Sequence, residues 1–481
     1  MLSPTTRGKR MSALAAPAAG SRLATNDSID MFLVAMQGSA RAHRFLGYIM
    51  RLDICALLAQ TVGAVPLNTI TTTWPLLLGM GVLMLGAGLQ GTLLGLRATL
   101  EGFPPPVTGV IMSCYYVGYL LGTVAAPWLL RRVGHIRVFA ALAAVASAAI
   151  LVQGSFVKPL PWGAMRLVSG LCFAGIYVVA ESWLNDRGSR ANRGRLLAVY
   201  MLILYVGLGA AQFLLLLSNP LTPAPFMLVS VLISLAMVPI VVSAQPIPER
   251  AVPRKVRYRD LYHNSPLGVV AVSVSGLICA IIFSMGPVYA RLSGLATTGV
   301  ATFMALSICA AVVTQYPVGR LSDRMDRRTV IAGVCTLATI VAGSIVAFGA
   351  MPRAIFLTLA ALFSGFALTL YSLAVSHVND KLEPAQMVAA SSALLRLNGA
   401  AAAIGPVLMG SLIAAFGPPA YFATLALLTG ALTVYDLWRK SRRGPVPPGK
   451  KGPFISAQPQ GMTGQIVGYA GHDDRRQPPR A

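Results

Sequence analysis

Long apolar stretches recur along this chain, and a short polar segment separates each one from the next. At about 1.5 Å of helical rise per residue, each stretch is long enough to cross the roughly 30 Å hydrocarbon core of a bilayer. The pattern therefore predicts twelve membrane-spanning helices, and the short connections make neighbouring helices antiparallel. The predicted spans lie near 74–96, 107–130, 138–156, 162–184, 196–217, 225–244, 267–290, 299–318, 329–350, 354–378, 387–416 and 420–438.

The composition agrees with a lipid environment. Hydrophobic residues make up 56% of the 481 residues and charged residues only 11%, and the mean hydropathy is +0.68. A soluble domain of this composition would have an apolar exterior. The net charge of +24 lies almost wholly between the apolar stretches and at the two ends of the chain. We therefore interpret it as a topology signal and expect no nucleic-acid partner.

Lysine and arginine are distributed unequally between the two sets of loops. Seventeen lie in the loops after even-numbered spans, and four lie after odd-numbered spans, namely Arg97, Lys158, Arg291 and Arg353. Because positively charged loops stay on the cytoplasmic side, this bias predicts that both termini are cytoplasmic. The predicted location is the inner (plasma) membrane of a bacterium.

An internal repeat divides the spans into two sets of six. The segment "PWLLRRVGHIR" (127–137) follows the second span of one half, and "GRLSDRMDRRT" (319–329) follows the second span of the other. Likewise, "ESWLND" (181–186) and "VSHVND" (375–380) end the two fourth spans. Parallel repeats related by an axis along the membrane normal are typical of one large class of secondary transporters.

The repeat sets the predicted domain boundaries. The two bundles cover 74–244 and 267–438, and 245–266 is a cytoplasmic linker between them. Residues 1–73 lie outside the repeat and are expected to be a disordered extension or the product of an upstream start codon, with a presequence as a further alternative. Residues 439–481 are expected to be a basic, disordered tail.

Several motifs resemble the major facilitator superfamily (MFS). The segment "GRLSDRMDRR" (319–328) resembles the family's loop signature G-x-x-x-D-R-x-G-x-R, with Asp326 in place of the second glycine. The matching residues are Gly319, Asp323, Arg324 and Arg328. The segment "RLVSGLCFAG" (166–175) resembles the fourth-span motif R-x-x-x-G-x-x-x-A.

The motifs "VVAESWLN", "NRGRLLAVY", "QYPVGRLSDRMDRR" and "SHVNDKLEPAQMVAASSALL", taken in order, resemble the bacterial YcaD-like branch of that family. The resemblance covers roughly residues 74–440. It implies an all-α integral membrane protein with twelve transmembrane helices in two pseudo-symmetric six-helix bundles. It also implies a transporter, without naming its cargo. A membrane-embedded enzyme is not expected, because no nucleophile–base pair or metal constellation in the sequence supports one.

No cofactor or metal is expected. The chain has no G-x-x-x-x-G-K-[ST] phosphate-binding loop, so ATP is not a direct energy source, and it has no H-E-x-x-H motif. Its six cysteines are scattered and show no C-x-x-C spacing. The partners we expect are therefore a small-molecule substrate, protons and the lipid bilayer, and we expect the protein to function as a monomer.

Glu181 is the only acid that the prediction places well inside a span, because Asp436 falls in the last turn of the twelfth. An ionised carboxylate there costs at least a few kcal/mol unless it is paired or faces water. Glu181 is thus a proton-coupling candidate, and a structural ion pair with a nearby arginine is the alternative. Arg166 lies near the other end of the same helix. The fourth-span motif implies that it also takes part in proton coupling, and snorkelling to the headgroups is its alternative.

Arg396 and Asn398 lie near the middle of the eleventh span. A guanidinium at that depth needs a partner or an aqueous cavity, and an anionic or strongly polar substrate is one solution. Carbonyls and tyrosines are the structural alternative. The remaining substrate-cavity candidates are polar side chains of other spans, namely Tyr177, Gln90, Tyr116 and Tyr119.

Charges at the cytoplasmic loops predict a latch between the halves. By the repeat, the 131–137 loop faces the start of the eleventh span, which pairs Arg131 and Arg132 with Glu383. The 319–328 loop faces the start of the fifth span, which pairs Asp323 with Arg193 and Arg195. We expect these pairs to close the inner side in the outward-open state. Ordinary surface pairing is the alternative, at about 1 kcal/mol or less per exposed pair.

The sequence thus predicts a secondary active transporter of small organic solutes that works by alternating access. We expect proton coupling to drive it, with uniport or another coupling ion as the alternatives. The alternative function is a membrane sensor or scaffold that retains the fold and transports nothing.

Overall fold

The computed structural model describes residues 67–187, 193–242 and 258–442, together with Gly452 and Phe454. The first six long helices are α4 (Leu67–Leu100), α5 (Pro105–Val133), α6 (His135–Ser155), α7 (Pro159–Arg187), α8 (Arg193–Leu214) and α9 (Ala224–Val242). The next set begins with the short α10 (Tyr258–Asn264), followed by α11 (Pro266–Ala280), η1 (Ile281–Met285) and α12 (Gly286–Leu292), which together form one span. The set ends with α13 (Thr297–Arg324), α14 (Arg327–Phe348), α15 (Arg353–Asn379), α16 (Pro384–Phe416) and α17 (Ala420–Arg442).

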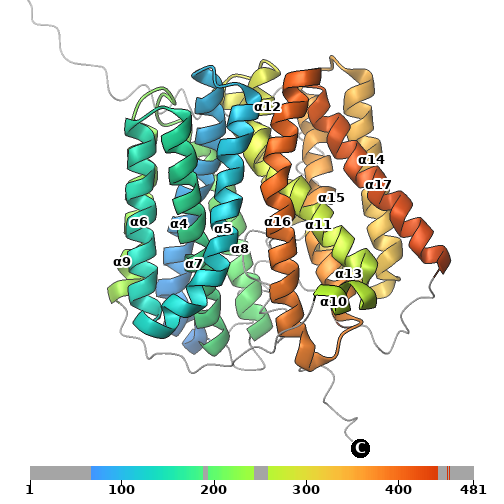
Figure 1. Cartoon of the computed structure of the whole chain (residues 1–481), viewed down its shortest axis with the longest axis horizontal. Coiled ribbons are helices and arrows are strands. Elements are labelled where there is room, and N and C mark those ends of the chain that lie inside the picture. Colours follow the sequence, from blue (N-terminus) through green and yellow to red (C-terminus); the bar gives the residue numbers. More distant parts are fainter. Residues whose placement is uncertain (1–66, 188–192, 243–257, 443–451, 453, 455–481) are drawn as a thin grey trace, which may run out of the picture. The chain divides into compact units, whose positions relative to one another are not determined.

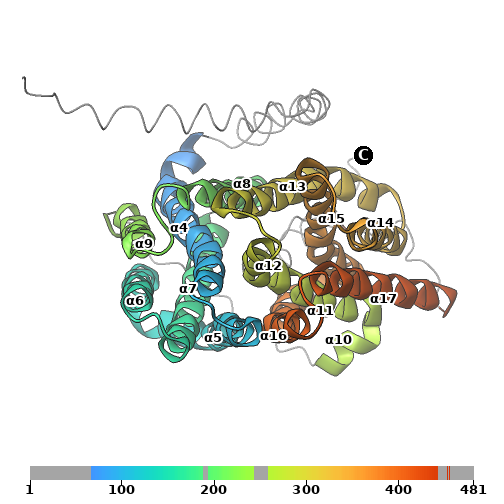
Figure 2. The ribbon, with the colours of Figure 1, turned by 90° about the horizontal axis from the view of Figure 1, so that it is seen from above.

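The twelve predicted spans are confirmed, since twelve helices in the described residues are long and apolar enough to cross a membrane. Figures 1 and 2 show them in two groups, α4 to α9 and α11 to α17. Within the first group α5 packs on α7, and within the second α13 packs on α15. Between the groups, α5 packs on α16 and α13 packs on α8. Both kinds of contact therefore occur twice, as a two-fold repeat requires.

The two ends of the helix bundle differ in the charge of their connecting segments. The basic end is where α5, α7, α13 and α15 finish, and it carries the arginine-rich loops 131–137 and 319–328. It lies at the bottom of Figure 1. The far end carries the short connections 101–104, 293–296 and 349–352.

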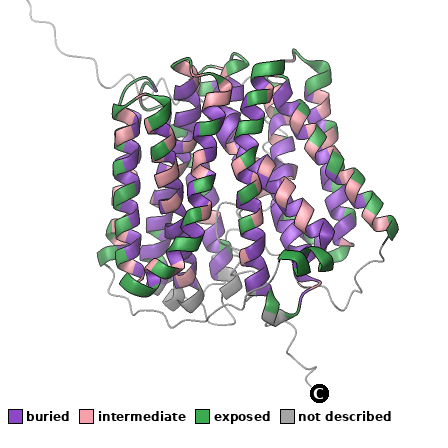
Figure 3. Ribbon diagram, viewed as in Figure 1, coloured by how far each residue is buried: buried purple, intermediate pink, exposed green. Residues whose placement is uncertain are grey.

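The outer surface of the helices is apolar along their length. Figure 3 shows exposed residues following the outward faces of the helices. Several large aliphatic side chains are half exposed or more near the middle of their helices, among them Leu121, Val124, Val206, Ile340 and Ile404. A surface of this kind is stable against lipid tails and unstable in water.

Glycines bring α5 and α7 into backbone contact. A Cβ atom at Gly170 of α7 would collide with the carbonyl oxygen of Tyr115, and one at Gly118 of α5 would collide with that of Leu167. Gly122 makes the same kind of contact one turn further along α5. Small residues are common where membrane helices approach closely, because lipid gives no hydrophobic drive for association.

The two halves also touch backbone to backbone toward the far end. Gly109 of α5 lies against the carbonyl group of Pro406 of α16, and Gly410 lies against that of Pro105. Gly95 of α4 packs against the other half as well, since a Cβ there would lie 3.2 Å from the ring of Pro287. This end is therefore tightly closed in this conformation.

Three segments differ from the predicted domain boundaries. Helix α4 begins at Leu67, before the predicted boundary at residue 74, and its candidate membrane span begins at Thr73. The linker contains α10, and α17 continues to Arg442 beyond the predicted end of the bundle. The remainder of the predicted extension, linker and tail falls outside the described residues, apart from Gly452 and Phe454.

The α5–α7 contact predicts a sharp sensitivity to side-chain size at position 170. We expect Gly170→Ala to lower the thermal stability of the detergent-solubilised protein, because overpacking against backbone costs about 1–3 kcal/mol. The matched control is Gly333→Ala in α14, where an added Cβ meets nothing within 4 Å. Equal melting temperatures for the two variants would contradict this packing.

Candidate functional site

A small cavity lies between the two halves of the protein. Its volume is about 50 Å³, which admits a water molecule or two but no organic solute. The first half contributes Ala87, Gly88, Gln90, Gly91, Thr92, Tyr115, Tyr116, Arg166, Phe173, Tyr177, Leu208 and Gln212. The second half contributes Phe283, Ser284, Met304 and Ile308. Three predicted cavity residues, Gln90, Tyr116 and Tyr177, are thus brought together here.

Arg166 lies in this cavity and is only 5% exposed. Its guanidinium carbon is 4.5 Å from the centre of the Tyr115 ring, and one terminal nitrogen is 3.6 Å from the sulfur of Met112. Arg166, Gly170 and Ala174 are spaced four residues apart, so they form one stripe of α7. Gly170 contacts the backbone of Tyr115, and Ala174 contacts Gly122. The fourth-span motif is therefore the surface of α7 that packs on α5.

Amide side chains link the helices around the cavity. Gln90 Nε2 donates to Gln153 Oε1 at 3.4 Å, and Thr92 Oγ1 donates to Gln212 Oε1 at 2.6 Å. Gln212 Nε2 in turn donates to the carbonyl oxygen of Leu208. These bonds satisfy buried polar groups where lipid supplies no partner.

A π-helical turn forms the second half's wall of the cavity. Pro287 has no N–H group to donate to the carbonyl of Phe283, and the N–H of Gly286 instead reaches the carbonyls of Ile281 and Ile282. The widened turn, η1, carries Phe283 and Ser284 into the lining. The Ser284 hydroxyl lies 3.2 Å from the Tyr116 hydroxyl, which joins the two halves. Single π-helical turns of this kind are frequent at functional sites.

Glu181 is buried, at 2% exposure, on the same helix as Arg166 but nearer the basic end. Fifteen residues of α-helix separate the two, or roughly 22 Å. Around Glu181, the hydroxyls of Tyr119, Tyr177 and Tyr200 lie within electrostatic range of its carboxylate. A fourth, Tyr371, comes from α15 of the other half. The Glu181 carboxylate thus interacts electrostatically with tyrosines of both halves.

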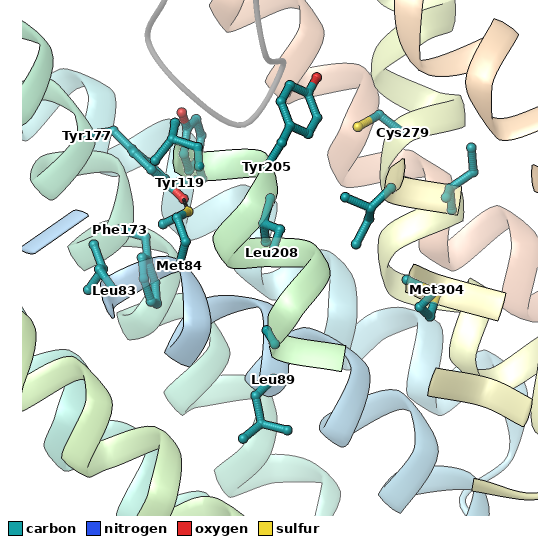
Figure 4. Packing of buried hydrophobic residues seen from close by; sticks show 14 of the residues in the cluster. Leu83, Met84, Leu89, Tyr119, Phe173, Tyr177, Tyr205, Leu208, Cys279 and Met304 are labelled. Carbon is teal, nitrogen blue, oxygen red and sulfur yellow. Dashed lines mark hydrogen bonds between the residues drawn. The ribbon is translucent and has the colours of Figure 1, made fainter. Parts of the chain in front are cut away.

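Aromatic side chains fill the space between Arg166 and Glu181. The rings of Tyr115 and Tyr119 are 6.3 Å apart, and those of Tyr119 and Tyr177 are 6.5 Å apart. Figure 4 shows Tyr119 and Tyr177 side by side above Met84, whose sulfur accepts a hydrogen bond of 3.4 Å from the Tyr177 hydroxyl. Predicted candidate Tyr119 also lines a second, smaller space with Asn398 and Cys279.

Arg396 is not in the cavity, which corrects the prediction for the eleventh span. Its side chain is exposed and Nε donates to the carbonyl oxygen of Ser392 at 3.3 Å. Ile404, two turns further along the helix, is also exposed. Because two residues of helix span about 200°, Arg396 and Asn398 point to opposite sides. Asn398 faces inward and donates from Nδ2 to the Val272 carbonyl at 3.0 Å and the Ser275 hydroxyl at 3.1 Å.

A buried ion pair at the basic end was not predicted. Arg327, 1% exposed, donates from Nε to Asp380 Oδ2 at 2.7 Å and from a terminal nitrogen to the Ser322 hydroxyl at 3.2 Å. It ties the start of α14 to the end of α15. One signal in the sequence could have indicated this pair. Asp380 is an acid at the end of the repeated "VSHVND" segment, where the predicted span ends.

The same network holds two residues from the C-terminal tail. Arg327 donates to the carbonyl oxygen of Gly452, and Gly452 N donates to Asp380 Oδ1 at 3.0 Å. Phe454 N donates to Asp323 Oδ1 at 2.8 Å, and its ring lies against Gly319. The glycine of the loop signature is therefore covered by an aromatic ring.

Asp326 replaces the signature's second glycine for a local reason. In the first half, the equivalent Gly134 has φ 87°, which favours glycine, whereas Asp326 has φ −60° and caps α14. Its carboxylate accepts from Arg328 N at 3.1 Å and pairs with the Arg328 guanidinium at 3.0 Å. Burial raises the pKa of Asp326, but these bonds from Arg328 outweigh it and the net pKa is lowered. The cap is therefore ionised at neutral pH.

The predicted latch residues lie at the basic end, on the helices that join the halves. Arg131 and Arg132 are exposed at the end of α5, and Glu383 is exposed just before α16. No ion pair joins them within the described part of the chain. Asp323 and Arg324 are exposed, and the side chains of Arg193 and Arg195 lie outside the described residues. The latch therefore stays a prediction.

Asp436 also differs from its predicted position. It is fully buried in α17, which continues for six residues beyond it. The prediction ended the span at 438 because the charged residues Arg439 and Lys440 follow. Glu181 is thus not the only buried acid within a span.

Comparison with known proteins agrees with this architecture. The family model described as Major Facilitator Superfamily matches residues 76–397 and 298–466. An MFS-type transporter of Enterobacter sp. (strain 638) is 29% identical over 388 residues, covering 77% of this chain and 96% of the relative. The MFS-type transporter YcaD of Escherichia fergusonii is 31% identical over 358 residues, covering 73% and 91%. The solved structure of the nucleoside transporter NupG aligns with a TM-score of 0.67 at 12% identity, covering 76% and 99%.

The family match, together with twelve membrane helices in two repeated halves that share a cavity, indicates a membrane transporter and not an enzyme. The chain belongs to the major facilitator superfamily, in the branch of YcaD-like MFS-type transporters. It is accordingly an integral membrane protein.

The Arg327–Asp380 pair yields a stability prediction. Asp380→Asn removes the nearer of two carboxylates around the buried Arg327 guanidinium, because Asp323 lies 3.9 Å away and is nearly half exposed. Breaking a buried ion pair costs about 3–5 kcal/mol, so the melting temperature of the purified protein is expected to fall sharply. The control Asp260→Asn makes the same chemical change at an exposed position of α10 and should leave the melting temperature unchanged. A small effect at both positions would show that Arg327 is held by its other contacts.

Proposed function

We propose that this protein is a proton-coupled secondary transporter of small organic solutes that works by alternating access. The observation that carries the proposal is a cavity lined by both halves, with Arg166 in it and Glu181 buried further along the same helix. A solute held between two rigid bundles is exposed to one side or the other as the bundles rock. NupG, a protein of the same fold, is a nucleoside transporter.

The closure of the far end supports one stage of such a cycle. Gly109, Gly410 and Gly95 bring the halves into contact there, and the cavity is too small for a solute. Opening toward either end requires these bundles to separate, which would enlarge the cavity they share. The protein functions as a monomer in this proposal, because one chain supplies both halves.

Glu181 is proposed to carry the coupled proton. Low-dielectric surroundings penalise the charged form of a carboxyl group, so its protonation is linked to how much water reaches it. Tyr371 of the other half lies within electrostatic range, so movement between the halves would change those surroundings. Arg166 is the second coupling candidate at the opposite end of the helix.

The proposed orientation places the basic end in the cytoplasm of a bacterial cell, with both termini inside. The excess of arginine and lysine in the loops at that end supports it. The far end, closed here, would then face away from the cytoplasm, and this conformation would be an inward-facing or occluded one.

Transport coupled to Glu181 is testable after reconstitution. Ligands found by a thermal-shift screen of the purified protein are offered to proteoliposomes with an imposed pH gradient. We expect flux to follow the gradient in the wild type and to lose that dependence in Glu181→Gln. The control Glu101→Gln, at a partly exposed acid paired with Arg97, should behave as the wild type. If flux in Glu181→Gln still followed the pH gradient, and the variant inserted normally into the membrane, Glu181 would not carry the coupled proton.

The latch is proposed to stabilise the outward-open state. There the pairs would be Arg131 or Arg132 with Glu383, and Asp323 with Arg193 or Arg195. Helices α5 and α16, and α8 and α13, are already neighbours, which supports this pairing.

Charge reversal tests the latch. Asp323→Arg should slow flux several-fold by placing like charges together, and adding Arg193→Asp and Arg195→Asp should restore it. Flux measured in proteoliposomes at equal protein content gives the comparison. Additive losses in the combined variant would contradict the pairing.

A further inference from the structure

Arg166 differs from the other buried arginines of this protein. Four arginines are buried among the described residues, and three of them pair with carboxylates: Arg97 with Glu101, Arg327 with Asp380 and Arg328 with Asp326. With the described residues, Arg166 makes no ion pair. No carboxylate occurs among the described residues that line its cavity.

The groups around Arg166 do not compensate its charge. The ionisable groups that interact with it are Cys114, Tyr115 and Tyr116, which are neutral at physiological pH. The guanidinium contacts a sulfur and an aromatic face, and its Nε has no hydrogen-bond partner in the part of the chain that the structure describes. A cation over a ring recovers about 2 kcal/mol when desolvated, which is less than the several kcal/mol that burying an unpaired charge costs.

The missing counter-charge is therefore expected to come from outside the chain. We propose that the substrate is a small organic monoanion, a carboxylate, and that Arg166 binds its carboxylate group. This inference rests on the proposed transport function and names the class of solute. The planar guanidinium matches a carboxylate through two parallel N–H bonds. A single cation in the lining suits one negative charge and not the two of a phosphate monoester.

The rest of the lining suits the body of such a molecule. Tyr115, Phe173 and Tyr177 present ring surfaces to an apolar or aromatic group, and Gln90 and Gln212 can bond a polar substituent. Gly91 also leaves room, since a Cβ there would meet nothing within 4 Å. The cavity is too small for such a molecule in this conformation. Because both halves line it, their separation would enlarge the cavity enough for the carboxylate to enter.

A structural role for Arg166 makes a different prediction. If the guanidinium only joined α7 to Tyr115 of α5, its removal would lower stability without changing which ligands bind. Ligand preference therefore separates the two roles, and thermal stability alone does not.

The test uses three carboxylates and their amides: benzoate with benzamide, hexanoate with hexanamide, and phenylacetate with phenylacetamide. Each is titrated against the full-length purified protein while its melting temperature is measured. We expect at least one carboxylate to raise the melting temperature and its amide not to. Arg166→Gln should weaken binding of that carboxylate about 10- to 100-fold, as expected for loss of a charge-assisted hydrogen-bonded pair. Arg166→Lys, which keeps the charge, should retain the preference at reduced affinity.

Three results would overturn the inference: no carboxylate binds, an amide binds as well as its carboxylate, or Arg166→Gln keeps the preference. If Arg166→Gln does not fold, the wild-type comparison and Arg166→Lys still decide. Binding in detergent needs no gradient, so its outcome is separate from transport. A carboxylate that binds through Arg166 but is never transported into proteoliposomes would contradict the proposed transport function and leave the binding site standing. Transport of neutral solutes that is unchanged in Arg166→Gln would contradict the carboxylate as substrate and leave the transport function standing.

Discussion

Lipid offers no hydrogen bonds, and this constraint decides the position of polar side chains inside the twelve helices. The protein meets it by different means at different depths. At the basic end Arg327 pairs with Asp380, and between α11 and α16 Asn398 reaches a carbonyl and a hydroxyl. In the cavity, the described residues that contact the Arg166 guanidinium are an aromatic ring and a sulfur. This buried cation thus lies where the two halves meet around a cavity.

The two halves share a fold but differ at the loop that follows the second span of each. His135 of the first half corresponds to Arg327 of the second, and its Nε2 lies 3.1 Å from the Ser182 hydroxyl. Gly134, with its positive φ, corresponds to the capping Asp326. The second half is therefore fastened at the basic end by the Arg327–Asp380 ion pair and by the charged cap Asp326.

The sequence was sufficient for the fold because span length and loop charge are one-dimensional signals, and all twelve spans were predicted. It also placed Gln90, Tyr116 and Tyr177 in a cavity. It could not choose between Arg396 and Asn398, because the rotation of a helix depends on its neighbours and not on depth. The Arg327–Asp380 pair joins residues 53 positions apart and follows only from the packing of α14 on α15. The latch, by contrast, is a prediction about the outward-open conformation, in which the two halves are arranged differently.

The contacts of Gly452 and Phe454 fasten a point of the tail to the second half, through Asp380, Asp323 and Arg327. That point is therefore expected to tilt with the second bundle as a rigid attachment. A spectroscopic label placed there and another on α6 would form a ruler across the molecule. Changes in the distance between the two labels would record the relative motion of the halves, without any label in the cavity.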